Sequence, residues 1–422
     1  MNQNGTVSGD TGVTRVLVVL RLFTGLLDSL ASRVWAPSGV PAIYKLIEGL
    51  AHRPDIDVRL VFTCKDADAA AHFPSNQTQH IDGLGEVHIL GWRRRPWLRC
   101  LGMDGKWREL MQLLSCLRLY FKFRPQTSYF GNANIFAAGL FARLGLGRVV
   151  FRLLGLHPFE KAVAGRRRGL MHWLYRSPFD HVVCTMDGSG GNHYLGDLIC
   201  PETPVSLKLN GVDRPEPRAE DIDRFRARFD LGGKPVVIFV GRLERTKGCR
   251  EFVEGMILLN RRTAVDAVVV GYGEMEAELR ALVDAEGGSG AVHFTGALPH
   301  DEIPAALALA DVYVSLNQFG NLSNTNLEAI AQGKCMLLLE SDPETHVDME
   351  TAELLPEESF PRVSRQNTAE RLAEILNNLL ADGSRIERLE AEVAGIGQRI
   401  LSSWPERTAF EIDLILGTSK AP

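Results

Sequence analysis

Two cationic residues on one short stretch are the strongest candidates for chemistry in this 422-residue chain. Arg242 and Lys247 follow the apolar run 236–240, whose β-branched and aromatic residues predict a buried parallel strand. A helical pattern over 251–259 comes next, so both cations are expected on a strand-to-helix loop. In open α/β sheets such loops bind ligands. A guanidinium and an ammonium beside a helix N-terminus suit a diphosphate, although a solvated surface pair explains the same residues equally well.

Alternating strands and helices surround that loop. The predicted strands cover 264–270, 291–294, 312–316 and 335–339, and the predicted helices cover 274–285, 299–309 and 325–332. This alternation predicts a parallel, doubly wound sheet. The Gly271-Tyr272-Gly273 turn inside it is a weak ligand signal, because a tight turn before a helix explains it.

The same stretch carries an ordered series of motifs. They are Val240-Gly241-Arg242-Leu243 with Gly248, Gly271-Tyr272-Gly273, Phe294-Thr295-Gly296, Ala310 to Val314, and Leu327 to Lys334. The series resembles the C-terminal half of retaining glycosyltransferases of family 4. The resemblance implies the GT-B fold: α/β, with two Rossmann-like domains whose parallel sheets face across a cleft. It also implies a nucleotide-sugar donor on this half and transfer of the sugar to an acceptor hydroxyl with retention, with Arg242 and Lys247 acting on the departing diphosphate.

A departure from the family pattern falls within the expected donor site. The family usually has two glutamates separated by seven residues, the second of which holds the ribose. Glu328 matches the second, but Gly320 stands at the first position. The identity of the sugar is therefore not carried over, and a weakly active or inactive relative stays open. The expected donor-binding residues are Ser38, Gly39, Gly241, Leu298, Gly320, Asn321, Ser323, Asn324, Thr325 and Glu328.

Three of the expected site residues lie in the first half. Ser38 and Gly39 best match the glycine-containing loop that faces the donor diphosphate in the family, but the usual double glycine is absent. Simple turn chemistry before a helix explains them as well. His157 follows the predicted strand 148–154 and matches a family histidine, so it is a candidate for acceptor contact or acid–base work. A turn residue before a proline is the alternative.

The segment 91–125 is strongly basic. It has nine Lys and Arg against two acidic residues, with Trp92 and Trp97 among its arginines. A predicted helix over 106–123 places Leu110, Leu113, Leu114, Leu117 and Phe121 on one face. Peripheral contact of residues 91–124 with an anionic membrane is one interpretation. An ordinary helix packed on the sheet with solvated arginines is the other. Arg166 to Arg168 and Trp173 to Arg176 form a second basic, aromatic patch.

The whole chain has the size of two α/β domains. We expect a disordered tail at 1–13, an N-terminal acceptor-side domain at 14–213, a nucleotide-sugar domain at 214–399, and a final helix within 400–422 that crosses back to the first domain. A net charge of −5 does not favour nucleic acid as a partner. Seven cysteines without a Cys-x-x-Cys pair argue against structural zinc and disulfides and fit a reducing cytosol. No signal peptide or apolar run of 18 residues is evident, so we expect a cytoplasmic protein, with the inner membrane face as one location.

These patterns favour a retaining, metal-independent glycosyltransferase. No Asp-x-Asp occurs in the loops expected at the cleft, so no metal or cofactor is expected. The acceptor is left open among a glycan, a lipid-linked molecule and a small molecule. Two alternatives remain: another GT-B enzyme, such as a sugar-nucleotide epimerase, and a two-lobed sugar-binding protein.

Overall fold

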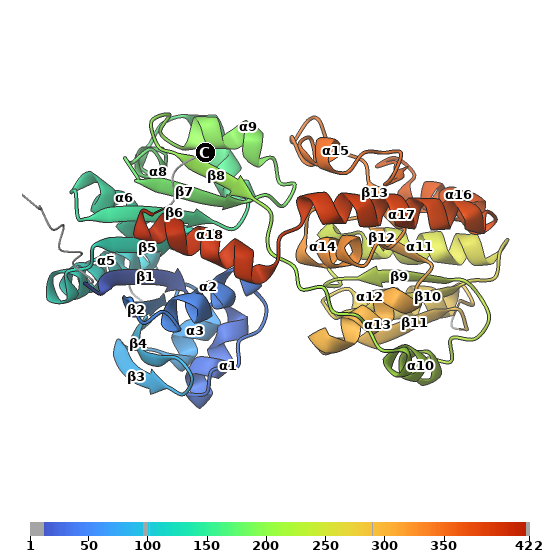
Figure 1. The fold of residues 1–422 in the computed structure, drawn as a ribbon, viewed down its shortest axis with the longest axis horizontal. Helices are drawn as coiled ribbons and strands as arrows, with labels where there is room; N and C mark the ends of the chain where they lie inside the picture. The colour runs from blue at the N-terminus through green and yellow to red at the C-terminus, as the bar shows by residue number, and fades with distance from the viewer. Residues whose placement is uncertain (1–11, 96–99, 101, 289, 419–422) are drawn as a thin grey trace, which may run out of the picture. The chain divides into compact units, whose positions relative to one another are not determined.

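The computed structural model in Figure 1 describes residues 12–95, 100, 102–288 and 290–418. They form two compact units. The first contains residues up to Thr185, residues 194–208 and the chain from Trp404 onward, and the second contains 186–193 and 209–403. The predicted boundary at 213/214 lies close to the observed one at 208/209. Residues 186–193 and 400–403, which were expected in the first domain, belong to the second unit. The predicted disordered tail falls almost wholly outside the described residues.

The first unit is built on an eight-stranded sheet in the order β3-β4-β2-β1-β5-β6-β7-β8. All neighbouring strands are parallel except β3 and β4. The bounds are β1 Thr14–Arg21, β2 Ile56–Thr63, β3 Gln77–Ile81, β4 Gly85–Leu90, β5 Thr127–Gly131, β6 Arg148–Leu153, β7 His181–Thr185 and β8 Val205–Lys208. The strand β3 was not predicted, because this edge strand is mostly polar and exposed and lacks an apolar run.

Helices cover both faces of this sheet, which is why its central strands are apolar throughout. One core lies under α1 (Thr24–Ser32), α2 (Pro41–Ala51), α3 (Ala67–His72) and α18 (Trp404–Leu416). The other lies under α5 (Asp104–Phe123), α6 (Ile135–Arg143), α7 (Pro158–Arg166), α8 (Leu170–Tyr175) and part of α9 (Gly191–Leu198). The 3₁₀ turn η1 (Asn132–Asn134) joins β5 to α6.

The first unit departs from the sequence-based expectations in two places. Helix α1, which was not predicted, forms within 21–38 because Leu26, Leu27 and Leu30 bury one helical face. The predicted apolar face of α5 is divided. Leu113 is buried, whereas Leu110, Leu114 and Phe121 are exposed on the outer side of the helix.

Helix α18 confirms the predicted return of the chain to the first unit. It is attached by a buried charge network in which Arg152 Nε lies 3.0 Å from Glu411 Oε1 and Arg407 Nη1 lies 2.7 Å from Glu411 Oε2. Tyr129 donates a hydrogen bond to the same carboxylate. Burial alone would raise the pKa of Glu411, but the two guanidinium groups hold that pKa below its ordinary value. Loss of one partner from such a buried pair costs about 3–5 kcal/mol.

The second unit is built on a six-stranded sheet in the order β11-β10-β9-β12-β13-β14, parallel throughout. The strands are β9 Val236–Val240, β10 Asp266–Val270, β11 Val292–Gly296, β12 Val312–Ser315, β13 Met336–Leu339 and β14 Arg362–Val363. From β9 the chain builds the sheet in one direction through β10 and β11. It then returns to place β12 on the other side of β9 and continues outward. The strand order therefore reverses between β9 and β12.

Helices also cover both faces of this second sheet. One core lies under α11 (Cys249–Asn260), α12 (Glu276–Ala285) and α16 (Thr368–Leu380). The other lies under α10 (Ala219–Arg228), α13 (Ile303–Leu309), α14 (Asn324–Ala331) and α17 (Gly383–Ile400). The short elements are η2 (Arg245–Lys247), η3 (His300–Glu302) and α15 (Thr351–Leu354). No helix among the described residues is long and apolar enough to cross a membrane.

Candidate functional site

The candidate site lies where the strand order of the second unit reverses. β9 and β12 are parallel neighbours in the sheet. After its carboxyl end β9 leads to α11 on one face of the sheet, and β12 leads to α14 on the other face. The loop after β9 carries Arg242 and Lys247, and the loop after β12 carries residues 316–323. Ligands bind at such a reversal in open α/β sheets, because the two departing loops leave a crevice between them.

Direct contacts hold the two loops together. The backbone N–H of Gln318 donates to the carbonyl of Thr246 over 2.9 Å. Gly248 precedes α11 with φ of 72°, and a Cβ at this position would lie 2.4 Å from the Cβ of Leu316. Glycine is needed here both for its backbone conformation and for the close approach of the second loop.

The glycines of the Gly271-x-Gly273 turn serve the packing of this region. A Cβ on Gly271 would lie 1.9 Å from the carbonyl oxygen of Gly241, and one on Gly273 would lie 2.4 Å from that of Leu243. The backbone N–H of Leu243 also donates to the carbonyl of Tyr272. Gly241 thus helps to set the path of the cationic loop, and close backbone packing accounts for the Gly-x-Gly pattern.

Arg242 and Lys247 differ in their surroundings. The Arg242 side chain is 69% exposed and its Nη1 lies 2.9 Å from Glu244 Oε1. Lys247 is half-buried. Burial and, to a smaller extent, the charge of Arg242 lower the pKa of Lys247, while Glu244 and Asp187 act in the opposite direction. A bound dianion would offset the lowering of the pKa of Lys247, since it brings negative charge close to the ammonium group.

Asn317 is a site residue that sequence analysis missed. It is buried, and its Oδ1 lies 3.5 Å from Lys247 Nζ. The same oxygen accepts from the backbone N–H of Phe319, and Nδ2 donates to the carbonyl of Gly320 over 2.6 Å. Asn317 therefore fixes its own loop and touches the Lys247 ammonium at once. Its position two residues after the short β12 strand was the available sequence signal.

Gly320 does not occupy a position at which a glutamate could stand. Its φ is 134°, and an added Cβ would lie 2.2 Å from the carbonyl oxygen of Asp187 and 2.7 Å from the carbonyl carbon of Gly188. The turn as folded in this chain therefore leaves no room for a carboxylate side chain at position 320. Glycine is required because the segment 186–193 packs directly on this turn.

Asn321 attaches the loop to the interior of the second unit through hydrogen bonds. It is fully buried, and its backbone N–H donates to Asp348 Oδ1 over 2.7 Å. Its Nδ2 donates to Leu339 O and to Asp348 Oδ2, each over 2.9 Å. Burial raises the pKa of Asp348 to about 7. The donors of Asn321 are thus engaged inside the protein, so its side chain acts on a ligand only through the shape of the loop.

Helix α14 begins directly after this loop. Ser323 is its N-cap, with a side-chain oxygen that accepts from the backbone N–H of Asn326. Asn324 accepts a hydrogen bond from Asn210 over 2.7 Å, and Thr325 is half-buried at the first turn. The N-terminus of α14 and the cationic loop after β9 leave the same edge of the sheet, and both favour negative charge.

Glu328 lies one turn further along α14. Its carboxylate is 23% exposed and lies 3.8 Å from Nε2 of His300 on η3. Burial raises the pKa of Glu328, the nearby His300 lowers it, and Asp213 raises it. Leu298, on the same loop as His300, is half-buried against the core. A carboxylate so placed can accept hydrogen bonds from the hydroxyls of a ligand.

The remaining predicted site residues belong to the first unit. Ser38 and Gly39 are exposed on the turn before α2, where Gly39 has φ of 89° and Ser38 donates its backbone N–H to Gly25 O. His157 is exposed at the start of α7, after the carboxyl end of β6. The roles of these three residues toward a donor or acceptor stay predictions.

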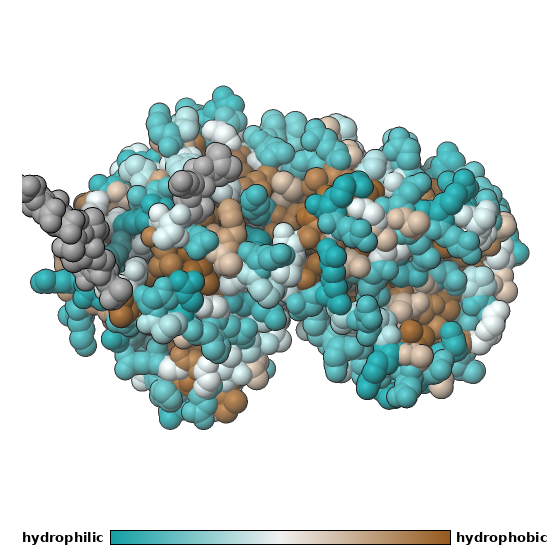
Figure 2. Space-filling model, viewed as in Figure 1, coloured by the Kyte–Doolittle hydropathy of each residue, from teal (hydrophilic) through white to brown (hydrophobic). Residues whose placement is uncertain are grey.

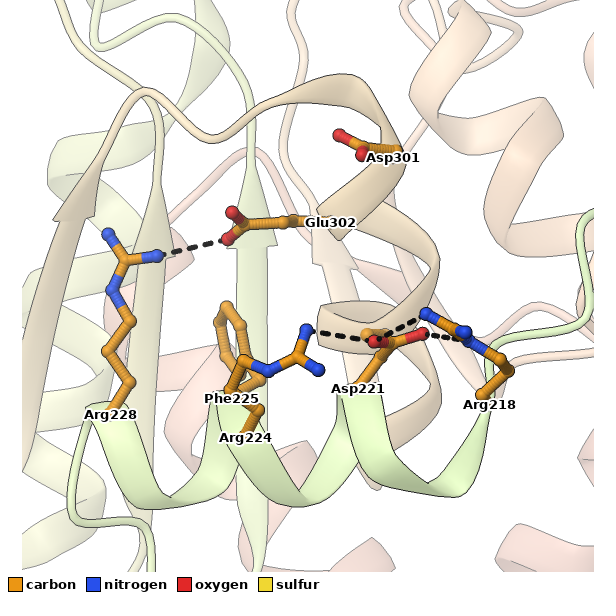
Figure 3. A pocket seen from close by; sticks show the side chains of 8 residues that line it. Arg218, Asp221, Arg224, Phe225, Arg228, Asp301 and Glu302 are labelled. Atoms are coloured by element: carbon orange, nitrogen blue, oxygen red, sulfur yellow. Dashed lines mark hydrogen bonds and ion pairs between the residues drawn. The ribbon is translucent and has the colours of Figure 1, made fainter.

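A separate hollow of about 310 Å³ lies between α10 and the η3–α13 region. Figure 3 shows that its arginines are already matched by carboxylates: Arg218 and Arg224 pair with Asp221, and Arg228 pairs with Glu302. The hollow therefore offers a diphosphate no surplus of cationic groups, in contrast to the Arg242–Lys247 loop. Among the described residues no group of three or more His, Cys, Asp or Glu is placed to hold a metal ion.

Solved structures similar to this chain decide the fold. HepE from Anabaena, crystallised in complex with UDP, has a TM-score of 0.68 at 15% identity and covers 96% of this chain and 100% of its own. WaaG, a glycosyltransferase involved in lipopolysaccharide biosynthesis, has a TM-score of 0.61 at 13% identity over 95% of this chain and 100% of its own. The fold is GT-B.

The sequence match concentrates on the GT-B unit that carries the candidate site. Residues 221–393 match the family model of glycosyl transferases group 1. A 2-deoxystreptamine glucosyltransferase from Streptomyces kanamyceticus is 35% identical over 124 residues, which are 29% of this chain and 32% of that protein. A GDP-mannose-dependent alpha-(1-6)-phosphatidylinositol monomannoside mannosyltransferase from Mycobacterium tuberculosis is 36% identical over 118 residues, 27% of this chain and 30% of that protein. The matches thus span about a third of those relatives.

Proposed function

We propose that this protein is a glycosyltransferase that moves a sugar from a nucleoside diphosphate to the hydroxyl of an acceptor. The observation that carries the proposal is the meeting of the Arg242–Lys247 loop with the Asn317 loop at the strand-order reversal of the second unit. The group 1 glycosyl transferase match over 221–393 supports it, because that segment contains both loops and Glu328.

The two cations act on the leaving group. When the bond between the sugar and the diphosphate breaks, negative charge grows on the phosphate oxygens. Arg242 and Lys247 stabilise that charge from fixed positions, a contribution of about 3–4 kcal/mol for each donor of this kind. Their two positive charges supply the neutralisation for which other enzymes use a divalent cation, so we propose that transfer needs no metal.

Glu328 would hold the nucleoside. Its partly exposed carboxylate can accept from the ribose hydroxyls while the phosphates lie at the start of α14. This arrangement leaves the sugar next to the diphosphate, where an acceptor hydroxyl can attack from the side of the departing group. We therefore propose transfer with retention of configuration at the sugar carbon.

The acceptor side belongs to the first unit. His157, exposed after β6, is proposed to contact the acceptor or the donor sugar, and Ser38 and Gly39 are proposed to face the diphosphate. A glycan, a lipid-linked molecule or a small molecule can serve as acceptor. A lipid-linked acceptor would fit work at the inner face of a membrane.

A panel of ligands tests the donor proposal. UDP-, GDP-, ADP- and CMP-sugars are added singly to the native chain, and the melting temperature is measured. A ligand that binds only the folded state raises it, so we expect one donor to stand out and Glu328→Ala to reduce its effect. Incubation of that donor with and without candidate acceptors then separates transfer from epimerisation. A product formed without acceptor would favour an epimerase, and binding without any product would favour an inactive relative.

A further inference from the structure

The outer side of α5 carries an unpartnered row of apolar side chains. Trp107, Leu110, Met111, Leu114 and Phe121 are between 36% and 64% exposed. Their spacing of three, four, seven and fourteen positions from Trp107 places them on one face of a helix. The opposite face carries the buried Leu113 and Cys116 and supplies the packing of α5 on the sheet. The outer row therefore takes no part in the packing of α5 on the sheet.

The exposed charged residues of α5 beside this row are all positive. Both acidic residues of the segment turn inward: Glu109 pairs with Lys65 and Arg108, at 2.7 Å and 2.9 Å, and the buried Asp104 accepts from the backbone N–H of Arg95. The exposed cations are left without these carboxylates; they are Arg93, Arg94, Arg95, Lys106, Arg118, Lys122 and Arg124. Arg118 lies within the apolar row itself, eleven positions after Trp107.

The tryptophan expected to anchor the segment has a different role. Trp92 is half-buried against the first-unit core, and Arg108 lies over its ring at 4.7 Å from the centroid. Trp97 lies outside the described residues. Another exposed apolar residue, Leu144, follows α6, which packs beside α5, and is 63% exposed. Nearby, on α8, Trp173 is 45% exposed and is stacked by Arg143.

We propose that this face of the first unit, defined by the outer side of α5, lies on an anionic lipid bilayer. Phe121, Leu114 and Trp107 enter the interface between headgroups and acyl chains, and Arg118 and Lys122 meet lipid phosphates. A helix with a broad apolar face and cations on its flanks binds in the plane of such a surface, because both the apolar burial and the attraction to anionic headgroups favour it. A protein partner would need an acidic surface of matching shape, whereas a bilayer requires only the pattern seen here.

The proposal is independent of sugar transfer and can be tested on the full-length chain. Vesicles of phosphatidylcholine, with and without phosphatidylglycerol, are sedimented with the protein. We expect binding at least about tenfold tighter to the anionic vesicles, weakened by salt, because each basic residue near the surface contributes a factor of about five. Lys247→Ala should bind vesicles like the native chain even though it impairs transfer.

Matched variants assign the binding to this face. Arg118→Glu and Phe121→Ser should each reduce binding to anionic vesicles by about tenfold or more. Arg226→Glu, on the exposed side of α10, and Val34→Ser, an exposed apolar residue beyond α1, should not. Circular dichroism confirms that each variant is folded. Equal binding to neutral and anionic vesicles, or no binding at all, would overturn the proposal. So would a dimer in sedimentation velocity that Phe121→Ser abolishes, since a second copy would then cover the face.

Discussion

Lys247 reaches across from the β9 loop to Asn317 on the β12 loop, with Nζ 3.5 Å from Oδ1. The two residues lie far apart in the sequence and come together because their strands are neighbours in the sheet. Asn317 is neutral, so it holds the ammonium in place without neutralising it. The positive charge of Lys247 thus stays available for a phosphate.

This contact leads to a prediction for Asn317→Asp. A carboxylate beside Lys247 would neutralise the ammonium and repel the carbonyl of Gly320, which now accepts from Nδ2. We expect the donor diphosphate to bind about tenfold more weakly, the scale of one close charge interaction. Isothermal titration with the preferred donor measures the change. Gln318→Glu adds the same charge on the neighbouring, exposed side chain and should have a smaller effect. Unchanged or tighter binding in Asn317→Asp would contradict this role.

Gly320→Ala should destabilise the second unit. Its φ of 134° and the 2.2 Å approach of an added Cβ to the Asp187 carbonyl leave no room for a side chain. We expect a loss of about 1–3 kcal/mol in the free energy of unfolding, typical for strained backbone positions. Chemical denaturation measures it. Gly232→Ala is the control, because a Cβ there meets no atom within 4 Å. Equal stability of the two variants would show that the turn adapts easily.

Donor binding should depend on pH through Glu328. Burial raises the pKa of this carboxyl above its ordinary 4.5, so the acceptor form needed for ribose is lost at a higher pH than for an exposed glutamate. His300 lowers that pKa, so His300→Ala should move the acid limb of donor affinity to higher pH. Asp213 raises it, so Asp213→Asn should move the limb to lower pH. Affinities measured from pH 4 to 8 test both signs, and a limb that stays in place in both variants would exclude Glu328 as its origin.

His157→Ala should lower turnover or weaken acceptor binding. The histidine is exposed where the chain leaves β6, with its backbone carbonyl accepting from Lys161, so the ring is not needed for the fold. We expect a loss of about 100-fold if it serves as an acid or base. His80→Ala, on the exposed edge strand β3, is the matched control. Steady-state kinetics with varied acceptor separate the two roles, and native values for both constants would remove His157 from the site.

Much of the second unit could be predicted from the sequence. The strand Val236–Val240 is observed with the predicted ends, and the Arg242–Lys247 loop follows it as expected. Such strands are buried on both faces, so their apolar runs are unbroken and bounded by turn residues. The expected series of alternating strands and helices is also observed, with ends that shift by a few residues.

Side-chain roles were harder to predict than elements. The family spacing, with seven residues between its two glutamates, places the first at Gly320, but a spacing cannot register how the intervening loop folds. In the structure that loop turns back on itself at Gly320, and Asn317 is the residue that touches Lys247. In α5 the spacing of apolar residues predicted a helical face but not which part of that face meets the sheet, so Leu113 is buried whereas Leu114 is exposed.

Turnover of Arg242→Ala and Lys247→Ala tests the central claim most directly. With the donor that most raises the melting temperature of the native chain, each variant should be slower by at least about 100-fold, the scale of losing one charge-stabilising donor. Arg261→Ala, at the opposite end of α11 and paired with Glu286, should keep native turnover. Circular dichroism should show all three folded. If Arg242→Ala and Lys247→Ala both turn over donor at the native rate, the two cations do not hold the departing diphosphate and the assignment of the site is wrong.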